Sequence, residues 1–274
     1  MKEILASHVN YLVEENTSNS NVNANPLNIN ILYESGEKHV TVLDGNKLEP
    51  IIRFPVRNAL HGNPIYDSTG HYVYLSSPDG WVSLFDLHRL KMVSEIRVGI
   101  NASSITISGD DRFIIVGNNL PNTLVVLDAK TLGLVKVILA IDRKGKSSRV
   151  SAVYDAKPRR NFLASLKDSP ELWEINYQIP PPAGFGEWVH DYRKDSGEAD
   201  IRNFPVRRLS LKHPIDNFFL DQEYVHVIAN SEKGRGQVVD LDLGRKVADL
   251  DVTNTLGFFS GATWKKGKDK FLAI

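Results

Sequence analysis

The chain has 274 residues, of which 42% are hydrophobic, so it can bury a sizeable core in one or two domains. Lys plus Arg and Asp plus Glu both number 33, and this zero formal net charge gives no general attraction to nucleic acid. The absence of cysteine excludes disulfides, thiolate metal sites, a cysteine nucleophile and haem attached through C-x-x-C-H. No apolar run reaches the roughly 18 residues that a membrane-spanning helix needs.

The N-terminal residues predict a polar leader. Residues 15–26 (ENTSNSNVNANP) are rich in Asn and Ser, a composition typical of flexible segments. The N-terminus shows neither an uninterrupted apolar segment nor a cleavage site, so it predicts no export signal. We therefore assign residues 1–28 to a flexible leader and residues 29–274 to the folded region.

The folded region contains a repeat. A β-rich run that ends in Asp, followed by a short turn and a second apolar run, occurs at Asp44, Asp86 and Asp128, with 42 residues between successive copies. ELWEINY places Asn176 at the same position, and GQVVDLDLGRKVADLDV places Asp242 there. An Asp at the end of a strand can accept hydrogen bonds from the backbone two residues on, which fixes a hairpin turn.

A second signal lies between these copies. A turn followed by an aromatic residue and another β-rich run recurs at Tyr72, Phe113, Phe162, Tyr224 and Phe271. Each unit thus reads as four strands in about 40–45 residues, the size of a β-propeller blade. Residues 178–205, rich in Pro, Gly and charge, interrupt the period and predict a long inserted loop.

The repeat predicts an all-β fold, a propeller of four-stranded blades. Four full units and partial ones at the ends give about five blades, and the chain stops inside a strand-like run directly after a turn, so the ring is predicted to be incomplete. An open ring exposes unpaired edge strands, from which we expect self-association.

Several longer strings identify a family. ALHGNPIYDSTGHYVYLSSPDGWVSLFDL, SRVSAVYDAKPRRNFLASLKDSPELWEINY, VHDYR, HPIDNFFLD and GRKVADLD closely resemble the haem d1 domain of the cytochrome cd1 nitrite reductase family. The resemblance runs from about Ile31 to the last residue and is strongest to the branch of dehydrogenases that act in haem d1 maturation.

The resemblance implies an eight-bladed propeller that binds haem d1, or its dihydro precursor, at the top of a central channel. It implies a c-type cytochrome or a nitrite reductase as protein partner, because this chain lacks a c-type haem of its own. It also implies a periplasmic location, whereas the missing export signal predicts that the chain, as encoded, stays in the cytoplasm.

His61, in ALHG, matches a family histidine that ligates the d1 iron. An imidazole is a sound haem ligand, because one ring nitrogen binds iron while a hydrogen bond orients the other. The alternative is a loop histidine without a ligand. We carry His61 forward as the metal ligand.

Two arginines are predicted to hold the carboxylates of the macrocycle. Arg149, in SRVSAVYDA, and Arg57, four residues before His61, offer the bidentate charged contact that suits a carboxylate. The alternative for both is a solvated loop arginine. Lys167 and Asp168, in SLKDSPELW, match a family string but are also compatible with a simple polar turn.

The sequence also departs from the family. The distal histidine expected before SGATW is absent from residues 255–259, and Ser103 stands where a family arginine is expected. These departures weigh against catalysis, and we identify no catalytic residue. His190, on the predicted loop, is a weak candidate for proton transfer, against the alternative of a loop residue with no chemical role.

The main functional prediction is therefore a haem d1-binding propeller, an oxidoreductase related to the dehydrogenase that converts dihydro-haem d1 to haem d1. By resemblance, that reaction turns a propionate side chain into an acrylate and passes electrons to a c-type haem. A nitrite reductase fragment, a cofactor-free propeller used as a binding or assembly scaffold, and an inactive gene fragment remain as alternatives.

Overall fold

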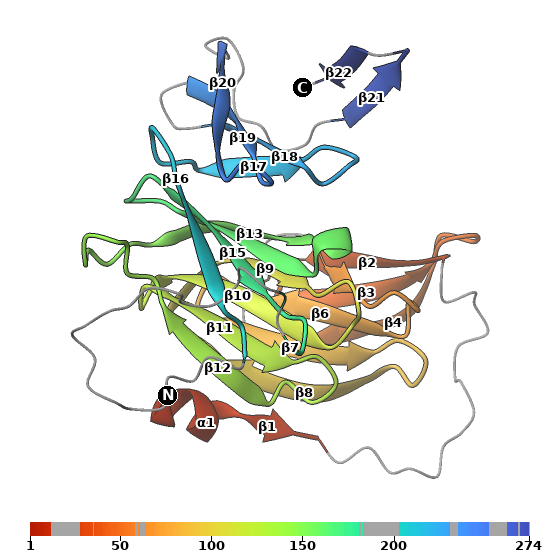
Figure 1. Cartoon of the computed structure of the whole chain (residues 1–274). Helices are drawn as coiled ribbons and strands as arrows, with labels where there is room; N and C mark the ends of the chain where they lie inside the picture. The colour runs from red at the N-terminus through yellow and green to blue at the C-terminus, as the bar shows by residue number, and fades with distance from the viewer. Residues whose placement is uncertain are drawn as a thin grey trace. The chain divides into compact units, whose positions relative to one another are not determined.

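The computed structural model describes residues 1–11, 28–34, 36–57, 60, 64–180, 182, 203–230, 235–251, 262–267 and 269–273 (Figure 1). Nearly all of their regular structure is β-strand, in two compact units, Met1–Leu139 and Ala140–Ile274. Among these residues no helix is both long and apolar enough to cross a membrane.

The first unit contains three antiparallel sheets. The first has three strands in chain order, β2 (Ile29–Glu34), β3 (His39–Asp44) and β4 (Glu49–Pro55). The second comprises β5 (Ile65–Tyr66), β6 (Tyr72–Ser76), β7 (Trp81–Asp86) and β8 (Lys91–Arg97), with β1 (Val9–Asn10) added beside β8. The third comprises β9 (Asn101–Ile107), β10 (Phe113–Leu120), β11 (Thr123–Asp128) and β12 (Leu134–Leu139).

The second unit repeats the same arrangement. One sheet comprises β13 (Val150–Ala156), β14 (Asn161–Leu166), β15 (Glu171–Asn176) and β16 (Val206–Ser210), with a 3₁₀ turn, η2 (Lys157–Arg159), between β13 and β14. The next comprises β17 (Asn217–Leu220), β18 (His226–Asn230), β19 (Arg235–Asp240) and β20 (Arg245–Asp251). A hairpin of β21 (Ala262–Lys266) and β22 (Asp269–Ala273) follows.

Each four-stranded sheet is a meander of consecutive antiparallel strands, and successive sheets of a unit pack face to face. In the first unit, Val40 and Val42 of β3 share a buried cluster with Val73 and Leu75 of β6. Every residue of β14 and β15 is buried, so both faces of these strands are covered. These features are those of propeller blades, and they confirm the predicted all-β fold.

The predicted Asp turns are present, with one correction. The carboxylates of Asp44, Asp86 and Asp128 each accept the backbone N–H groups two and three residues on, and the amide oxygen of Asn176 accepts the N–H two residues on. In the fifth copy this residue is Asp240, at the end of β19, and not Asp242 as the sequence suggested. Asp240 and Asp242 lie two residues apart in the alternating sequence GQVVDLDL, so the pattern alone did not distinguish them.

The N-terminus also differs from the predicted leader. Lys2–Ser7 form a short helix, α1, and β1 pairs with β8 through Val9–Glu95 and Asn10–Ser94. Ile4 packs against the core shared by the second and third sheets. The apolar residues of this segment and the unpaired edge of β8 explain why it is docked. Residues 15–26, on which the prediction of flexibility rested, lie outside the described part of the chain.

The predicted insertion separates β15 from β16. Most of residues 178–205 lies outside the described residues. The two strands that it joins pair with each other from Glu171–Ser210 to Ile175–Val206, so the insertion leaves the blade intact.

Candidate functional site

Every sheet of four consecutive strands has two ends that differ in their connections. At one end, links join the last strand of a sheet to the first strand of the next, and the turn between the second and third strands also lies there. We call this the link end. The other two turns of each sheet lie at its opposite end, which we call the turn end. Arg57 lies in the link after β4, and Arg149 lies in the link before β13.

Two of the predicted site residues fall outside the described part of the chain. His61, predicted to ligate iron, and His190, predicted as a weak candidate for proton transfer, are not among the described residues. Both roles therefore stay predictions.

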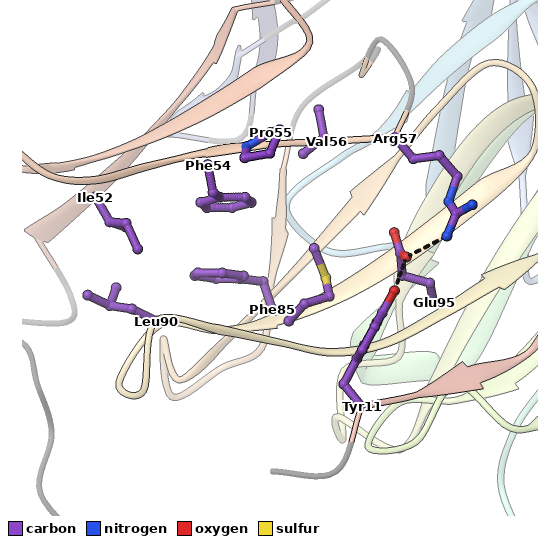
Figure 2. Close-up of a pocket in the computed structure, with 10 residues that line it drawn as sticks. Tyr11, Ile52, Phe54, Pro55, Val56, Arg57, Phe85, Leu90 and Glu95 are labelled. Atoms are coloured by element: carbon purple, nitrogen blue, oxygen red, sulfur yellow. Dashed lines mark hydrogen bonds and ion pairs between the residues drawn. The ribbon is translucent and has the colours of Figure 1, made fainter.

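Arg57 is described, and its side chain lies against the outer strands of the second sheet (Figure 2). Its guanidinium stacks over the ring of Trp81, 4.6 Å from the ring centre, and its Nη2 lies 3.5 Å from Oε2 of Glu95 on β8. The same Glu95 oxygen accepts the hydroxyl of Tyr11 at 2.6 Å, while Oε1 accepts Ser83 Oγ. Glu95 is buried, whereas the Arg57 side chain is 51% exposed.

One wall of a cavity of about 390 Å³ is formed by Tyr11, Arg57 and Glu95. The remaining wall is apolar and includes the stacked rings of Phe54 and Phe85, whose centres are 4.6 Å apart. The cavity lies between β4 and β8, the last strands of their sheets. Arg57 thus contacts the outer strands, whereas the first strand of a blade lines a propeller channel.

Arg149 lies in a different setting, at the link end of the sheet β13–β16. Its Nε and Nη2 donate to the Asp168 carboxylate at 2.9 and 2.5 Å, and its backbone N–H donates to the same carboxylate at 3.0 Å. Asp168 lies in the turn between β14 and β15. This bidentate pair leaves the Arg149 side chain 47% exposed, so solvent and ligands can reach it.

The hydrogen bonds from Arg149, together with its charge, hold the pKa of Asp168 down, at about 2. Asp168 is consequently ionised throughout the physiological range, and the pair stays charged on both sides. The sequence left Asp168 open between a family match and a simple polar turn, and in the structure this turn residue is half of an ion pair.

The link before β13 is itself ordered by a buried carboxylate. Asp142 accepts the Ser169 hydroxyl at 2.7 Å and the backbone N–H groups of Lys144 and Lys146. The hydrogen bond from Ser169, followed by that from the Lys146 backbone, lowers the pKa of Asp142. The hydrogen bonds to Asp142 fix the link as a hairpin. Residues 143–147 are exposed, so the cationic side chains of this hairpin lie at the surface.

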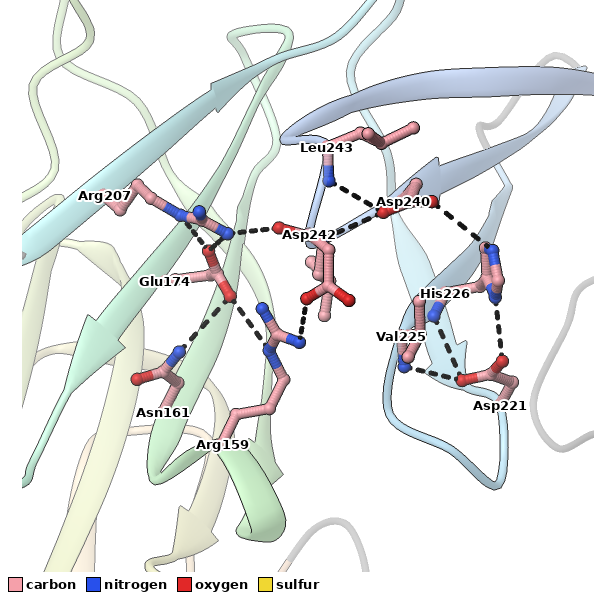
Figure 3. A network of polar contacts seen from close by, with 11 residues as sticks. Arg159, Asn161, Glu174, Arg207, Asp221, Val225, His226, Asp240, Asp242 and Leu243 are labelled. Carbon is pink, nitrogen blue, oxygen red and sulfur yellow. Dashed lines mark hydrogen bonds and ion pairs between the residues drawn. The ribbon is translucent and has the colours of Figure 1, made fainter. Parts of the chain in front are cut away.

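The turn end of the same sheet holds a buried network instead (Figure 3). Glu174 on β15 is fully buried and contacts Arg207 on β16 and Arg159 in η2. Arg207 also donates to the backbone oxygen of Leu241, and Arg159 pairs with Asp242 at 2.7 Å. The two arginines thereby join this sheet to the β19–β20 turn of the next one, a structural role.

The inserted loop also leaves from the turn end. Asn176 accepts the Gln178 N–H and donates from its own backbone to Pro205, and Tyr177 donates to Arg160 beside η2. The anchors of the loop that carries His190 thus lie at the end of the sheet opposite Arg149.

The arrangement therefore suits anion binding at the link end. In the described residues, no cluster of three or more His, Cys, Asp or Glu side chains could hold a metal ion. Arg149 on Asp168, with the adjoining cationic hairpin, offers accessible and preorganised donors for a carboxylate.

Comparisons with known proteins agree with these observations. A family model described as the cytochrome D1 heme domain matches residues 24–274. The chain is 42% identical over 244 residues to dihydro-heme d1 dehydrogenase of Pseudomonas aeruginosa. This match covers 89% of this chain and 45% of that protein. It is 31% identical over 152 residues to Protein NirF of the same organism, with 54% and 38% covered.

A solved structure gives the same result. The structure titled dihydro-heme d1 dehydrogenase NirN in complex with DHE matches with a TM-score of 0.85 at 39% identity. The match covers 99% of this chain and 54% of that one, so the chain spans about half the length of the relatives it matches.

Proposed function

Because the chain belongs to the cytochrome D1 haem domain family, we propose that it binds a d1-type haem, in a propeller related to that of dihydro-haem d1 dehydrogenase. The observation that carries the proposal is the 42% identity to that dehydrogenase over 89% of the chain.

The described residues fit the anionic rim of such a ligand. A d1-type macrocycle carries several carboxylates, and Arg149 offers an accessible guanidinium whose orientation is already fixed by Asp168. We assign Arg149 to these carboxylates and keep His61 as the proposed iron ligand. Arg57 is a weaker assignment, because its ion pair with Glu95, at 3.5 Å, does not hold the guanidinium in a bidentate contact like the one that orients Arg149.

In a complete assembly the haem would supply the redox chemistry, while the chain would bind and orient the macrocycle. The dehydrogenase reaction removes two electrons and two protons from a side chain of the ligand. These electrons need an acceptor, and we propose a c-type cytochrome for this role; these 274 residues contain no cysteine that could attach its haem. A periplasmic location follows from the same proposal.

Ser103 favours one alternative, a cofactor-free scaffold. This residue, at the position of the expected family arginine, lies on β9 and donates to the backbone oxygen of Gly117 at 3.0 Å. A neutral side chain there removes one expected partner for a carboxylate of the macrocycle.

A titration with haem d1 followed by visible absorption tests the proposal. We expect a saturable spectral change with the wild-type protein, loss of the iron-ligand signature in His61→Ala and at least about tenfold weaker binding in Arg149→Gln. Arg57→Gln should bind within about twofold of wild type.

Arg112→Gln is the matched control, because Arg112 pairs with Asp110 at 2.7 Å and is 44% exposed, but lies in a turn at the turn end of its sheet. A wild-type protein with no spectral change at micromolar concentration would contradict haem binding and leave the scaffold alternative.

A further inference from the structure

We infer that Asp168 is a positioning residue, which fixes the Arg149 guanidinium in the orientation that receives a carboxylate of the macrocycle. The inference rests on the proposed function and adds a residue that never touches the ligand itself. At the link end of the sheet β13–β16, this exposed arginine is held by a carboxylate of the chain itself.

Asp168 holds Arg149 at both its backbone and its side chain. The carboxylate accepts the Arg149 backbone N–H at 3.0 Å and receives Nε and Nη2 in a bidentate contact. The backbone is paired in return, since Lys167 N donates to the oxygen of Arg149 at 2.8 Å and Asp168 N donates to Ser148 Oγ at 2.9 Å. Each bond restricts a rotation that an arginine in a loop would otherwise retain.

The turn that carries Asp168 is also fixed. Its neighbour Ser169 donates to the buried Asp142 at 2.7 Å, and Lys146 Nζ donates to the backbone oxygen of Asp168 at 3.4 Å. The hairpin before β13 and the turn before β15 therefore hold each other. Arg149 emerges from this corner with its direction set by two chain segments rather than by one.

Fixing a long side chain before binding lowers the entropy that is lost when the ligand arrives. A second effect opposes it, because the negative charge of Asp168 repels a carboxylate. Around the corner this charge is outweighed, since five cationic residues (Arg143, Lys144, Lys146, Arg149 and Lys167) face four acidic ones (Asp142, Asp168, Glu171 and Asp216), a net charge of +1. Solvent screens the repulsion further, as the Asp168 side chain is 27% exposed.

The two effects predict opposite results when the charge of Asp168 is removed. If Asp168 positions Arg149, then Asp168→Asn weakens binding. If Asp168 only neutralises Arg149, the same change strengthens binding, because a cation is released. The sign of the change in affinity therefore separates positioning from charge compensation.

The experiment is a thermodynamic cycle on the full chain. The dissociation constant for haem d1 is measured by visible absorption for wild type, Asp168→Asn, Arg149→Gln and the double variant, with melting temperatures recorded in parallel. We expect Asp168→Asn to raise the dissociation constant by about tenfold. In the Arg149→Gln background the same change should add less than about twofold, because Asp168 acts through Arg149.

Asp110→Asn is the matched control. Asp110 accepts Nε of Arg112 at 2.8 Å and its backbone N–H at 3.3 Å, which repeats the arrangement of Asp168 and Arg149 at a turn end. We expect Asp110→Asn to leave the dissociation constant unchanged and to shift the melting temperature about as much as Asp168→Asn.

Three outcomes would overturn the inference. Equal or tighter binding in Asp168→Asn would show charge compensation or no role, and an undiminished effect of Asp168→Asn in the Arg149→Gln background would show that Asp168 acts independently. Equal weakening by Asp110→Asn would show a general effect of stability. A wild-type protein that binds no haem d1 would instead refute the proposed function, and the inference with it.

Discussion

The two ends of the sheet β13–β16 both hold arginines on carboxylates, yet they differ in burial. At the turn end, Arg159 and Arg207 surround Glu174, whose side chain is fully buried. At the link end, Arg149 and Asp168 are 47% and 27% exposed. The same pair of side-chain types thus occurs once in the interior and once at the surface of a single sheet.

The difference in burial separates stability from binding. Removing either side of a buried ion pair leaves the other side as an uncompensated charge in a medium of low dielectric constant. An exposed pair is screened by water and contributes little to stability. Because its guanidinium is exposed, a ligand can reach it. We therefore expect variants at the turn end to change stability and variants at the link end to change affinity.

The largest effect is expected for Glu174→Gln. The change leaves Arg159 and Arg207 without their shared carboxylate, and it should lower the free energy of unfolding by about 3 kcal/mol. Urea unfolding followed by circular dichroism measures this loss. A loss below about 1 kcal/mol, the range of exposed pairs, would break the comparison between the two ends.

A smaller effect is expected for Asp142→Ala, which tests whether burial or position in the sheet decides stability. Asp142 lies at the link end but is buried, and its removal leaves the Ser169 hydroxyl and two backbone N–H groups without their acceptor. The free energy of unfolding should fall by more than in Asp168→Asn, because donors that lose their acceptor are costly. Urea unfolding beside Asp168→Asn is the measurement, and a smaller loss in Asp142→Ala than in Asp168→Asn would contradict the role of burial.

The smallest effect concerns pH. The folded-state pKa of Asp168, about 2, lies below its ordinary value of 3.8, so the stability from this pair is present above about pH 4 and is lost as the pH falls toward 2. Because the pair is partly exposed, its contribution should not exceed about 1 kcal/mol.

The measurement is the difference in unfolding free energy between wild type and Asp168→Asn at pH 6 and at pH 3. The wild-type advantage should shrink at the lower pH. An advantage that grows on acidification would mean that the pKa of Asp168 is raised rather than lowered in the folded protein.

The sequence by itself determined the blade and the family. An Asp at the end of a strand organises its turn through N–H groups two and three residues on, so Asp44, Asp86 and Asp128 show the repeat without tertiary information. Strands buried on both faces appear as apolar runs for the same local reason. His61 and Arg149 were chosen from strings that match the family, and Arg149 is in an accessible setting.

Tertiary structure decided how the charges are paired. Asp168 lies 19 residues from Arg149, Glu95 lies 38 residues from Arg57, and Glu174 lies 33 residues from Arg207. Such pairs depend on which strands and turns are brought together at one end of a sheet, and the residues next to each charge in the sequence do not specify this. Docking of the N-terminal segment on β8 and the choice of Asp240 over Asp242 have the same cause, because both are set by the partner strand.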